Sequence, residues 1–133
     1  MSLMDEIRAI RPRAVLVIKA GKKIFYGTIE KNASGDAFEK KLTSEHISVD
    51  MHDNGGFEKV GKLPWALPES QKLITAAPGD IVLYSGDSVA VCYDENEREL
   101  TRLARIGNVT KKELLKALGN GDASVSFHLE WSE

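Results

Sequence analysis

The sequence predicts a mainly β fold, a small closed β-barrel or a tightly curved sandwich of about seven to eight strands with two short capping helices. Short apolar runs recur along the chain between clusters of Gly, Pro and Asp, which favour turns. Only two segments carry apolar residues at helical spacing. The 133 residues, of which 42% are hydrophobic, suffice for a single core of ordinary size.

The first two predicted strands form a hairpin near the N-terminus. Ala14–Ile18 and Ile24–Ile29 are short apolar runs, and the turn-forming Gly21 lies between them. The first run is apolar on both faces, which is typical of a strand with one face in a barrel interior and the other covered by a helix. We therefore expect Ala14–Ile18 in the centre of the sheet and not at its edge.

A short helix and a half-buried strand are predicted to follow the hairpin. Helical spacing of the apolar residues indicates a helix near 36–43, with Ser34 or Asp36 as its N-cap. His46–Met51 then alternates between polar and apolar side chains, which indicates a strand. The face of this strand that packs on the core is predicted to carry Ile47, Val49 and Met51.

Three motifs dense in turn-forming residues follow in Asp53–Gly107. They are D-N-G-G-F-E-K-V-G-K-L-P from Asp53, P-G-D-I-V-L-Y-S-G-D from Pro78 and T-R-L-A-R-I-G from Thr101. Such residues favour a long irregular segment that feeds strands and forms a pocket rim. Leu63–Pro78, with three prolines and no sustained period, is predicted to be an extended loop.

The remaining elements are four strands and one helix, joined by short polar turns. Ile81–Tyr84 and Val89–Tyr93 are predicted to form a hairpin. After a polar turn at Asp94–Glu99, Leu100–Ile106 is a further strand, and the capping-box sequence Thr110–Glu113 begins a helix that ends at Gly119 or Gly121. The chain closes with an alternating strand, 123–131, whose inward residues are predicted to be Val125, Phe127, Leu129 and Trp131.

Charge, cysteine content and hydropathy limit the partners and the compartment. The net charge is −2 and Lys and Arg form no basic stripe, so we expect neither nucleic acid nor an anionic membrane as a partner. No apolar run approaches the roughly 20 residues that span a bilayer. The single cysteine, Cys92, has no internal disulfide partner and is predicted to be a buried, inert thiol in a strand. The cytoplasm is therefore the expected compartment.

One domain, residues 13–131, is predicted after an N-terminal extension, residues 1–12. Met1–Leu3 precede a second methionine, Met4, which is consistent with an expression scar and a natural start at Met4. An exported form from which a leader has been removed stays open for the same reason. The sequence leaves the oligomeric state open.

The order of motifs resembles the small bacterial cyclophilin-like proteins from about Arg13 to Glu130. The resemblance depends on Ile81–Tyr93 behind P-G-D, with G-G-F-E-K-V-G upstream and T-R-L-A-R-I-G plus the Thr110 helix downstream. It implies the cyclophilin β-barrel, in a family whose members mostly have no settled activity. Cyclophilins proper are peptidyl-prolyl isomerases, which lower the rotation barrier of an X–Pro bond of roughly 20 kcal/mol.

The sequence lacks the arginine motif on which prolyl isomerisation by cyclophilins depends. The arginine of cyclophilins lies in a Phe-His-Arg motif, whereas Phe127-His128 is followed here by Leu129. Arg102 and Arg105 are the only arginines near the candidate pocket, and neither matches the motif. We favour an interpretation of both as solvent-facing residues paired with acids such as Glu97 or Glu99. No catalytic residue is therefore assigned.

Two functions from different classes remain, a binding protein without catalysis and a prolyl isomerase with a rearranged site that uses Arg102 or Arg105. We prefer the first, with a peptide or a small molecule as ligand and no cofactor. Trp65, between two prolines, either stacks on the ligand or folds back as a lid on the barrel end. Glu58 and Lys59 point to opposite sides of the chain, so at most one lines the pocket, and an exposed loop charge is the favoured interpretation. The predicted ligand-binding residues are Gly56, Glu58, Trp65, Tyr84, Tyr93 and Arg102.

A metal site is not predicted. Asp50, His52 and Asp53 lie close together and carry ligand atoms that metals use, but no further ligands follow at a recognisable spacing. A polar strand face in water explains the three residues equally well. His46 and His128 have no nearby nucleophile and orienting acid in the sequence, so we expect both at the surface.

Overall fold

The computed structural model describes residues 13–132, which form nine strands and two helices. The two helices are α2 and α3, and the figures use the same labels. In chain order the elements are β1 (Arg13–Ala20), β2 (Lys23–Ile29), α2 (Ala33–Ser44), β3 (Ile47–Asn54), β4 (Glu58–Lys62), β5 (Lys72–Ala76), β6 (Asp80–Tyr84), β7 (Ser88–Cys92), β8 (Asn96–Ile106), α3 (Lys111–Leu118) and β9 (Ala123–Ser132).

Eight of the strands close into a ring. Neighbouring strands follow the order β2-β1-β9-β3-β4-β7-β6-β8, and β8 pairs again with β2, so the sheet has no free edge along this circuit. All of these pairs are antiparallel. The prediction of a closed, mainly β fold is confirmed, and β1 lies between two partners as expected.

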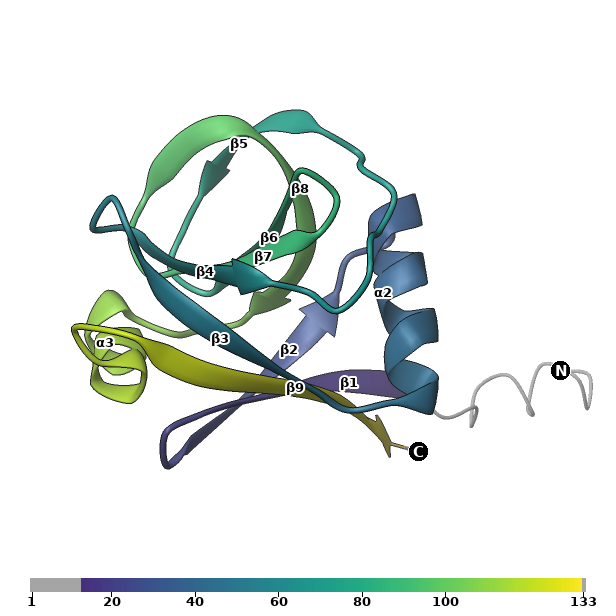
Figure 1. The fold of residues 1–133 in the computed structure, drawn as a ribbon, viewed down its shortest axis with the longest axis horizontal. Helices are drawn as coiled ribbons and strands as arrows, with labels where there is room; N and C mark the ends of the chain where they lie inside the picture. Colours follow the sequence, from purple (N-terminus) through teal and green to yellow (C-terminus); the bar gives the residue numbers. More distant parts are fainter. Residues whose placement is uncertain (1–12, 133) are drawn as a thin grey trace, which may run out of the picture.

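The long strand β8 pairs with three strands, β2, β5 and β6. Its first half pairs with β5, and its second half pairs with β6 across an irregularity at Ile81/Val82. In Figure 1, β8 sweeps in an arc beside β5, β6 and β7. A bulge of this kind bends a strand and increases its twist. The first half of β8 and β5 therefore enclose a second, smaller apolar cluster made of Ala76, Val82, Ala90, Cys92 and Leu100.

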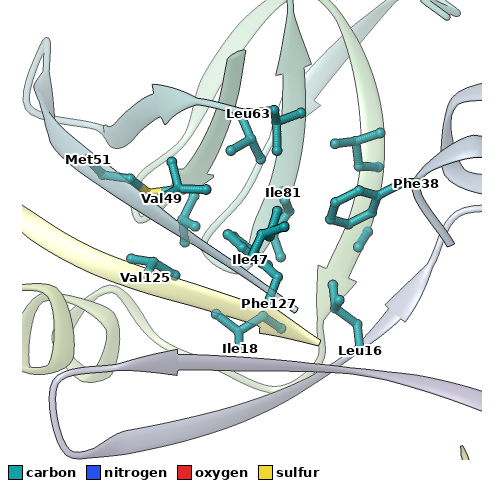
Figure 2. Close-up of a cluster of buried hydrophobic side chains, with 14 of the residues drawn as sticks. Leu16, Ile18, Phe38, Ile47, Val49, Met51, Leu63, Ile81, Val125 and Phe127 are labelled. Carbon is teal, nitrogen blue, oxygen red and sulfur yellow. The ribbon is translucent and has the colours of Figure 1, made fainter. Parts of the chain in front are cut away.

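The main core fills the interior of the ring. Figure 2 shows inward side chains from β1, β3, β6, β9 and α2 converging there. The alternation in β3 and β9 produces this arrangement, because every second side chain of a strand points to the same face. The fully buried members include Leu16, Ile18, Phe38, Ile81 and Phe127.

The two helices pack on opposite sides of the ring (Figure 1). α2 inserts Phe38 and Leu42 into the core, and its N-cap is Asn32, whose side chain accepts a hydrogen bond from the Gly35 N–H. The prediction of Ser34 or Asp36 as N-cap was wrong, because the helix begins earlier than the apolar spacing indicated. Neither helix in the described residues is long and apolar enough to cross a membrane.

α3 has the predicted capping box. The Thr110 side chain accepts from the Glu113 N–H, and the Glu113 carboxylate accepts from the Thr110 N–H. The helix ends at Gly119, whose φ of 79° favours glycine. Leu114 and Leu118 are buried in the core, and Leu115 packs against it.

Three stretches predicted to be irregular are strands. β4 lies within the first turn-rich motif, β5 lies in the predicted loop Leu63–Pro78, and β8 begins at Asn96 within the predicted turn Asp94–Glu99. These strands are rich in charged side chains or lie next to prolines, so their apolar pattern is weak. Trp131 was also predicted wrongly: its side of β9 is the inward one, but it lies beyond the end of the core and is 56% exposed.

Candidate functional site

Two adjoining hollows lie on the outer face of the sheet. Their volumes are about 410 and 400 Å³, and both are lined by Asp50 and His52. The first extends to the start of β9 and the second to β4 and β7. We call the two hollows together the β3 groove. Its polar side chains are Ser48, Asp50, His52, Lys62, Ser88, Asp122 and Ser124.

The β3 groove follows directly from the alternation of β3. Ile47, Val49 and Met51 are buried in the core, so the residues between them point outward. β3 pairs with β9 through Ile47–Met51 but with β4 only through His52–Asn54. The regular β3–β4 ladder therefore ends next to Gly61, and the second hollow lies over this end of the ladder.

Gly61 allows the close approach of β4 to β3 at this point. A Cβ at position 61 would lie 2.3 Å from the Asp50 carbonyl oxygen and 2.6 Å from the Val49 side chain. No side chain fits at such distances without a shift of the backbone. The glycine is therefore required by packing and not by a turn.

The charges of the β3 groove are mainly negative. Asp50 and Asp122 are exposed, and within residues 13–132 neither has a basic partner at salt-bridge distance. The one lysine of the groove, Lys62, is paired with Asp87 at 3.0 Å. Two carboxylates are thus available to a positively charged ligand.

Glu58 is fully buried on the outer face of β4, where three side chains donate hydrogen bonds to it. Its carboxylate accepts hydrogen bonds from Tyr84 Oη at 2.5 Å, Asn54 Nδ2 at 2.7 Å and Arg98 Nη2 at 2.6 Å. The Arg98 guanidinium lies 4.7 Å from the centre of the Phe57 ring and 4.8 Å from that of Tyr84. This arrangement, the Glu58 cluster, satisfies a buried charge with a cation and two neutral donors.

Lys59 is fully buried on the opposite face of the same strand, inside the ring. Its Nζ donates to the Gly121 carbonyl at 2.6 Å and lies 3.5 Å from Asp53 Oδ1. Tyr93 Oη also donates to Asp53. The hydrogen bond from Tyr93, with the Lys59 charge, lowers the pKa of Asp53, while burial and the Asp53 carboxylate raise the pKa of Tyr93 to about 12.

Arg102 and Arg105 share the buried carboxylate of Asp80. Arg105 Nε donates to Asp80 Oδ1 at 3.0 Å, and Arg102 Nη2 donates to Oδ2 at 3.2 Å. Their partner is therefore Asp80 and not Glu97 or Glu99, and the sequence-based pairing was wrong. The spacing of residues in the sequence does not reveal this pairing, because Asp80 lies on the neighbouring strand β6.

The predicted ligand-binding residues are spread over several places. Glu58 and Tyr84 meet in the Glu58 cluster, Tyr93 lies with Lys59, and Arg102 lies with Asp80. Gly56 is in the turn between β3 and β4. None of these residues lines the β3 groove.

Trp65 folds back onto the protein, as in the second of its two predicted roles, a lid on the barrel end. Its ring meets Phe38 edge to face at 6.1 Å between centres, and its indole N–H donates to the Glu45 carboxylate. It packs on the main core beside α2.

Cys92, His46 and His128 are the remaining titratable residues that the sequence singled out. Burial, followed by the charge of Glu58, raises the pKa of Cys92, which is fully buried as predicted. The rings of His46 and His128 stack with centres 4.9 Å apart. In the described part of the chain, no three His, Cys, Asp or Glu side chains gather at a distance that would hold a metal ion.

Residues 18–130 match the sequence profile of the cyclophilin-like family, which is most of the chain. The chain belongs to the cyclophilin-like family. No curated protein matches this cyclophilin-like chain. The family therefore accounts for the closed sheet, and the function must be argued from the site.

From the sequence alone, Asp50 and His52 are either metal ligands or part of a polar strand face, and no role is predicted for Asp122 or Lys62. The alternation of β3 already indicated that Asp50 and His52 share an exposed face. Their proximity to Asp122 depends on the pairing of β3 with β9, 72 residues later by numbering (Asp50 to Asp122), which no local pattern encodes.

Proposed function

We propose that this cyclophilin-like protein binds an extended, positively charged peptide segment in the β3 groove without changing it chemically. The observation that carries the proposal is the pair of adjoining hollows that share Asp50 and His52. Each hollow lies within the roughly 300–1,000 Å³ range of ligand sites. Together they cross β9, β3, β4 and β7, which suits a chain longer than a single side chain.

The charge of the groove supports a basic ligand. Asp50 and Asp122 are separate carboxylates in the first hollow, and a Lys or Arg side chain of a peptide can pair with either. Serine hydroxyls at 48, 88 and 124 supply donors and acceptors for the peptide backbone. Because these groups are exposed, each contact is expected to be weak and sensitive to salt.

Prolyl isomerisation is the alternative, and the positions of the arginines argue against it. Such catalysis needs a donor aimed at the proline nitrogen in a pocket that holds the ring. Arg102 and Arg105 are both engaged by Asp80, and neither lines the β3 groove. The basic side chains in the groove are His52 and Lys62, of which Lys62 is paired with Asp87.

Fluorescence anisotropy with labelled ten-residue peptides tests the binding proposal. Lysine-containing peptides are expected to bind more tightly than neutral or acidic peptides of equal length, and less tightly as salt rises. Asp50→Asn or Asp122→Asn should weaken binding about two- to fivefold, the range for one exposed ion pair. Glu99→Gln, which removes an exposed charge from β8, is the matched control and should leave the affinity unchanged. Equal binding of acidic and basic peptides would contradict the proposal.

An NMR exchange assay on Xaa-Pro peptides separates binding from isomerisation. We expect no acceleration of cis–trans exchange at protein concentrations that saturate the peptide. Robust acceleration that disappears in Arg102→Ala or Arg105→Ala would overturn the non-catalytic proposal in favour of a rearranged isomerase site.

A further inference from the structure

A second, smaller hollow lies between the end of β2, β5 and β8. It has a volume of about 140 Å³, and it shares no lining residue with the β3 groove. Its polar lining consists of Glu30, Lys31, Asn32, Ser70, Lys72 and Arg102, and Leu100 contributes an apolar side. A space of this size is below the roughly 300 Å³ at which sites for drug-sized ligands begin, so it suits only a small molecule or ion.

Arg102 lies in this hollow with part of its hydrogen-bonding capacity unused. The side chain is 21% exposed, and Nη2 donates to Asp80, while Nη1 is 4.0 Å from Glu30 Oε1. Its Nε is buried and has no hydrogen-bond partner in the described part of the chain. A guanidinium has five N–H donors, and a buried donor without an acceptor is costly.

The local charge is positive. Asp80 neutralises only one of the two guanidiniums that it contacts, because Arg105 shares it with Arg102. Lys31 and Lys72 also line the hollow, and no carboxylate within residues 13–132 is at salt-bridge distance from either. The cations Arg102, Lys31 and Lys72 therefore face one lining carboxylate, that of Glu30.

The walls of the hollow are fixed by hydrogen bonds between distant segments. Asn32 Nδ2 donates to the Arg102 carbonyl at 2.9 Å, and the Glu30 N–H donates to the Leu103 carbonyl at 2.8 Å. The Ser70 N–H donates to Thr101 Oγ1 at 2.8 Å. The backbone segments that form the walls are thus held in place before a ligand arrives, which lowers the entropy cost of binding.

We propose that this hollow binds a small oxyanion, a phosphate or a carboxylate group, between Arg102, Lys72, Lys31 and the Ser70 hydroxyl. A carboxylate is planar and a phosphate is tetrahedral, and guanidinium and ammonium donors bind the negatively charged oxygens of both groups. This site is independent of the peptide-binding proposal, because the two sets of residues do not overlap.

NMR titration of the full chain with inorganic phosphate and, separately, with acetate tests the oxyanion site, with ionic strength held constant by chloride. We expect saturable amide shifts at Asn32, Ser70 and Lys72, and the tighter of the two anions identifies the preferred group. Lys72→Gln should weaken binding at least threefold, whereas Lys112→Gln, which removes an exposed charge from α3, should not change it.

Arg102→Lys provides a second variant that keeps the charge but loses the planar fork, and it should also weaken binding. Shifts that rise without saturation, or that affect Lys112 as strongly as Lys72, would overturn the proposal. Unchanged affinity in both Lys72→Gln and Arg102→Lys would overturn it as well.

Discussion

Glu58 and Lys59 are neighbours in the sequence, and both are fully buried on opposite faces of one strand. Burial of a charge is costly unless partners replace the water that is lost. Glu58 has a cationic partner and two neutral donors, whereas Lys59 has a backbone carbonyl and a half-exposed carboxylate. The two residues therefore fix β4 from both sides, and their main role is structural.

Glu58→Ala is expected to destabilise the fold by about 3 kcal/mol, at the lower end of the range for breaking a buried ion pair. The lower end applies because Arg98 is 25% exposed and can be solvated after the loss of its partner. Urea unfolding monitored by circular dichroism measures the change. The control Glu99→Ala removes an exposed carboxylate and should change the free energy of unfolding by less than about 0.5 kcal/mol. Equal effects of the two substitutions would contradict the structural role of Glu58.

Tyr93→Phe is expected to raise the pKa of Asp53 toward its ordinary value of 3.8, because the hydrogen bond from Tyr93 is the main cause of the lowered pKa. With a lowered pKa, the ionised carboxylate contributes stability that is fully present above pH 3.8 and is lost as the pH falls through the pKa of the folded state. The variant should therefore lose less stability on acidification than the wild-type protein. Carbon-detected NMR titration of the Asp53 carboxyl group gives the pKa directly. An unchanged pKa would show that Tyr93 does not control it.

At the scale of elements, β4 shows what separates the predicted strands from the missed ones. β1, β6, β7 and β9 have strong apolar runs or alternation, and the sequence predicted them. β4 carries Glu58 and Lys59, follows Gly56 and contains Gly61, so its local pattern is that of a turn. It is a strand because its charges find partners far away in the chain, 40 residues on for Arg98 and 62 for Gly121. Such partners are fixed by the register of the sheet and not by neighbouring residues.

The candidate site was missed for a related reason. All six predicted ligand-binding residues lie within the turn-rich stretch Asp53–Gly107. The fold uses five of them for structural contacts: Glu58, Trp65, Tyr84, Tyr93 and Arg102. The β3 groove is instead lined by the outward face of a strand that the sequence predicted correctly.

Gly61→Ala is expected to separate β3 from β4 and to destabilise the fold by about 1–3 kcal/mol, the cost of overpacking. The added Cβ would lie 2.3 Å from the Asp50 carbonyl oxygen. Thermal unfolding measures the loss, and amide hydrogen exchange should increase in β3 and β4. Gly107→Ala is the control, since a Cβ there has no neighbour within 4 Å. Similar stability of the two variants would contradict the close approach of the strands.

At the scale of the whole molecule, the hydrophobic core fills the interior of the ring, and the candidate site lies on the outer face. Side chains from the strands and from the two helices form this core, and Figure 2 shows part of the packing. The β3 groove lies outside, over the junction of β9, β3, β4 and β7. The oxyanion hollow lies elsewhere, beside β5 and β8. The cyclophilin-like fold thus presents two separate hollows, which we propose as independent ligand sites.

The central claim is that the β3 groove binds a basic peptide, and an NMR titration of isotope-labelled protein with a lysine-containing, proline-containing peptide tests it most directly. The account predicts that the largest amide shifts occur at Asp50, His52, Gly61 and Asp122, and that the cis–trans exchange rate of the peptide stays at its uncatalysed value. Largest shifts around Arg102 or on α3, or accelerated exchange in the bound peptide, would contradict the account.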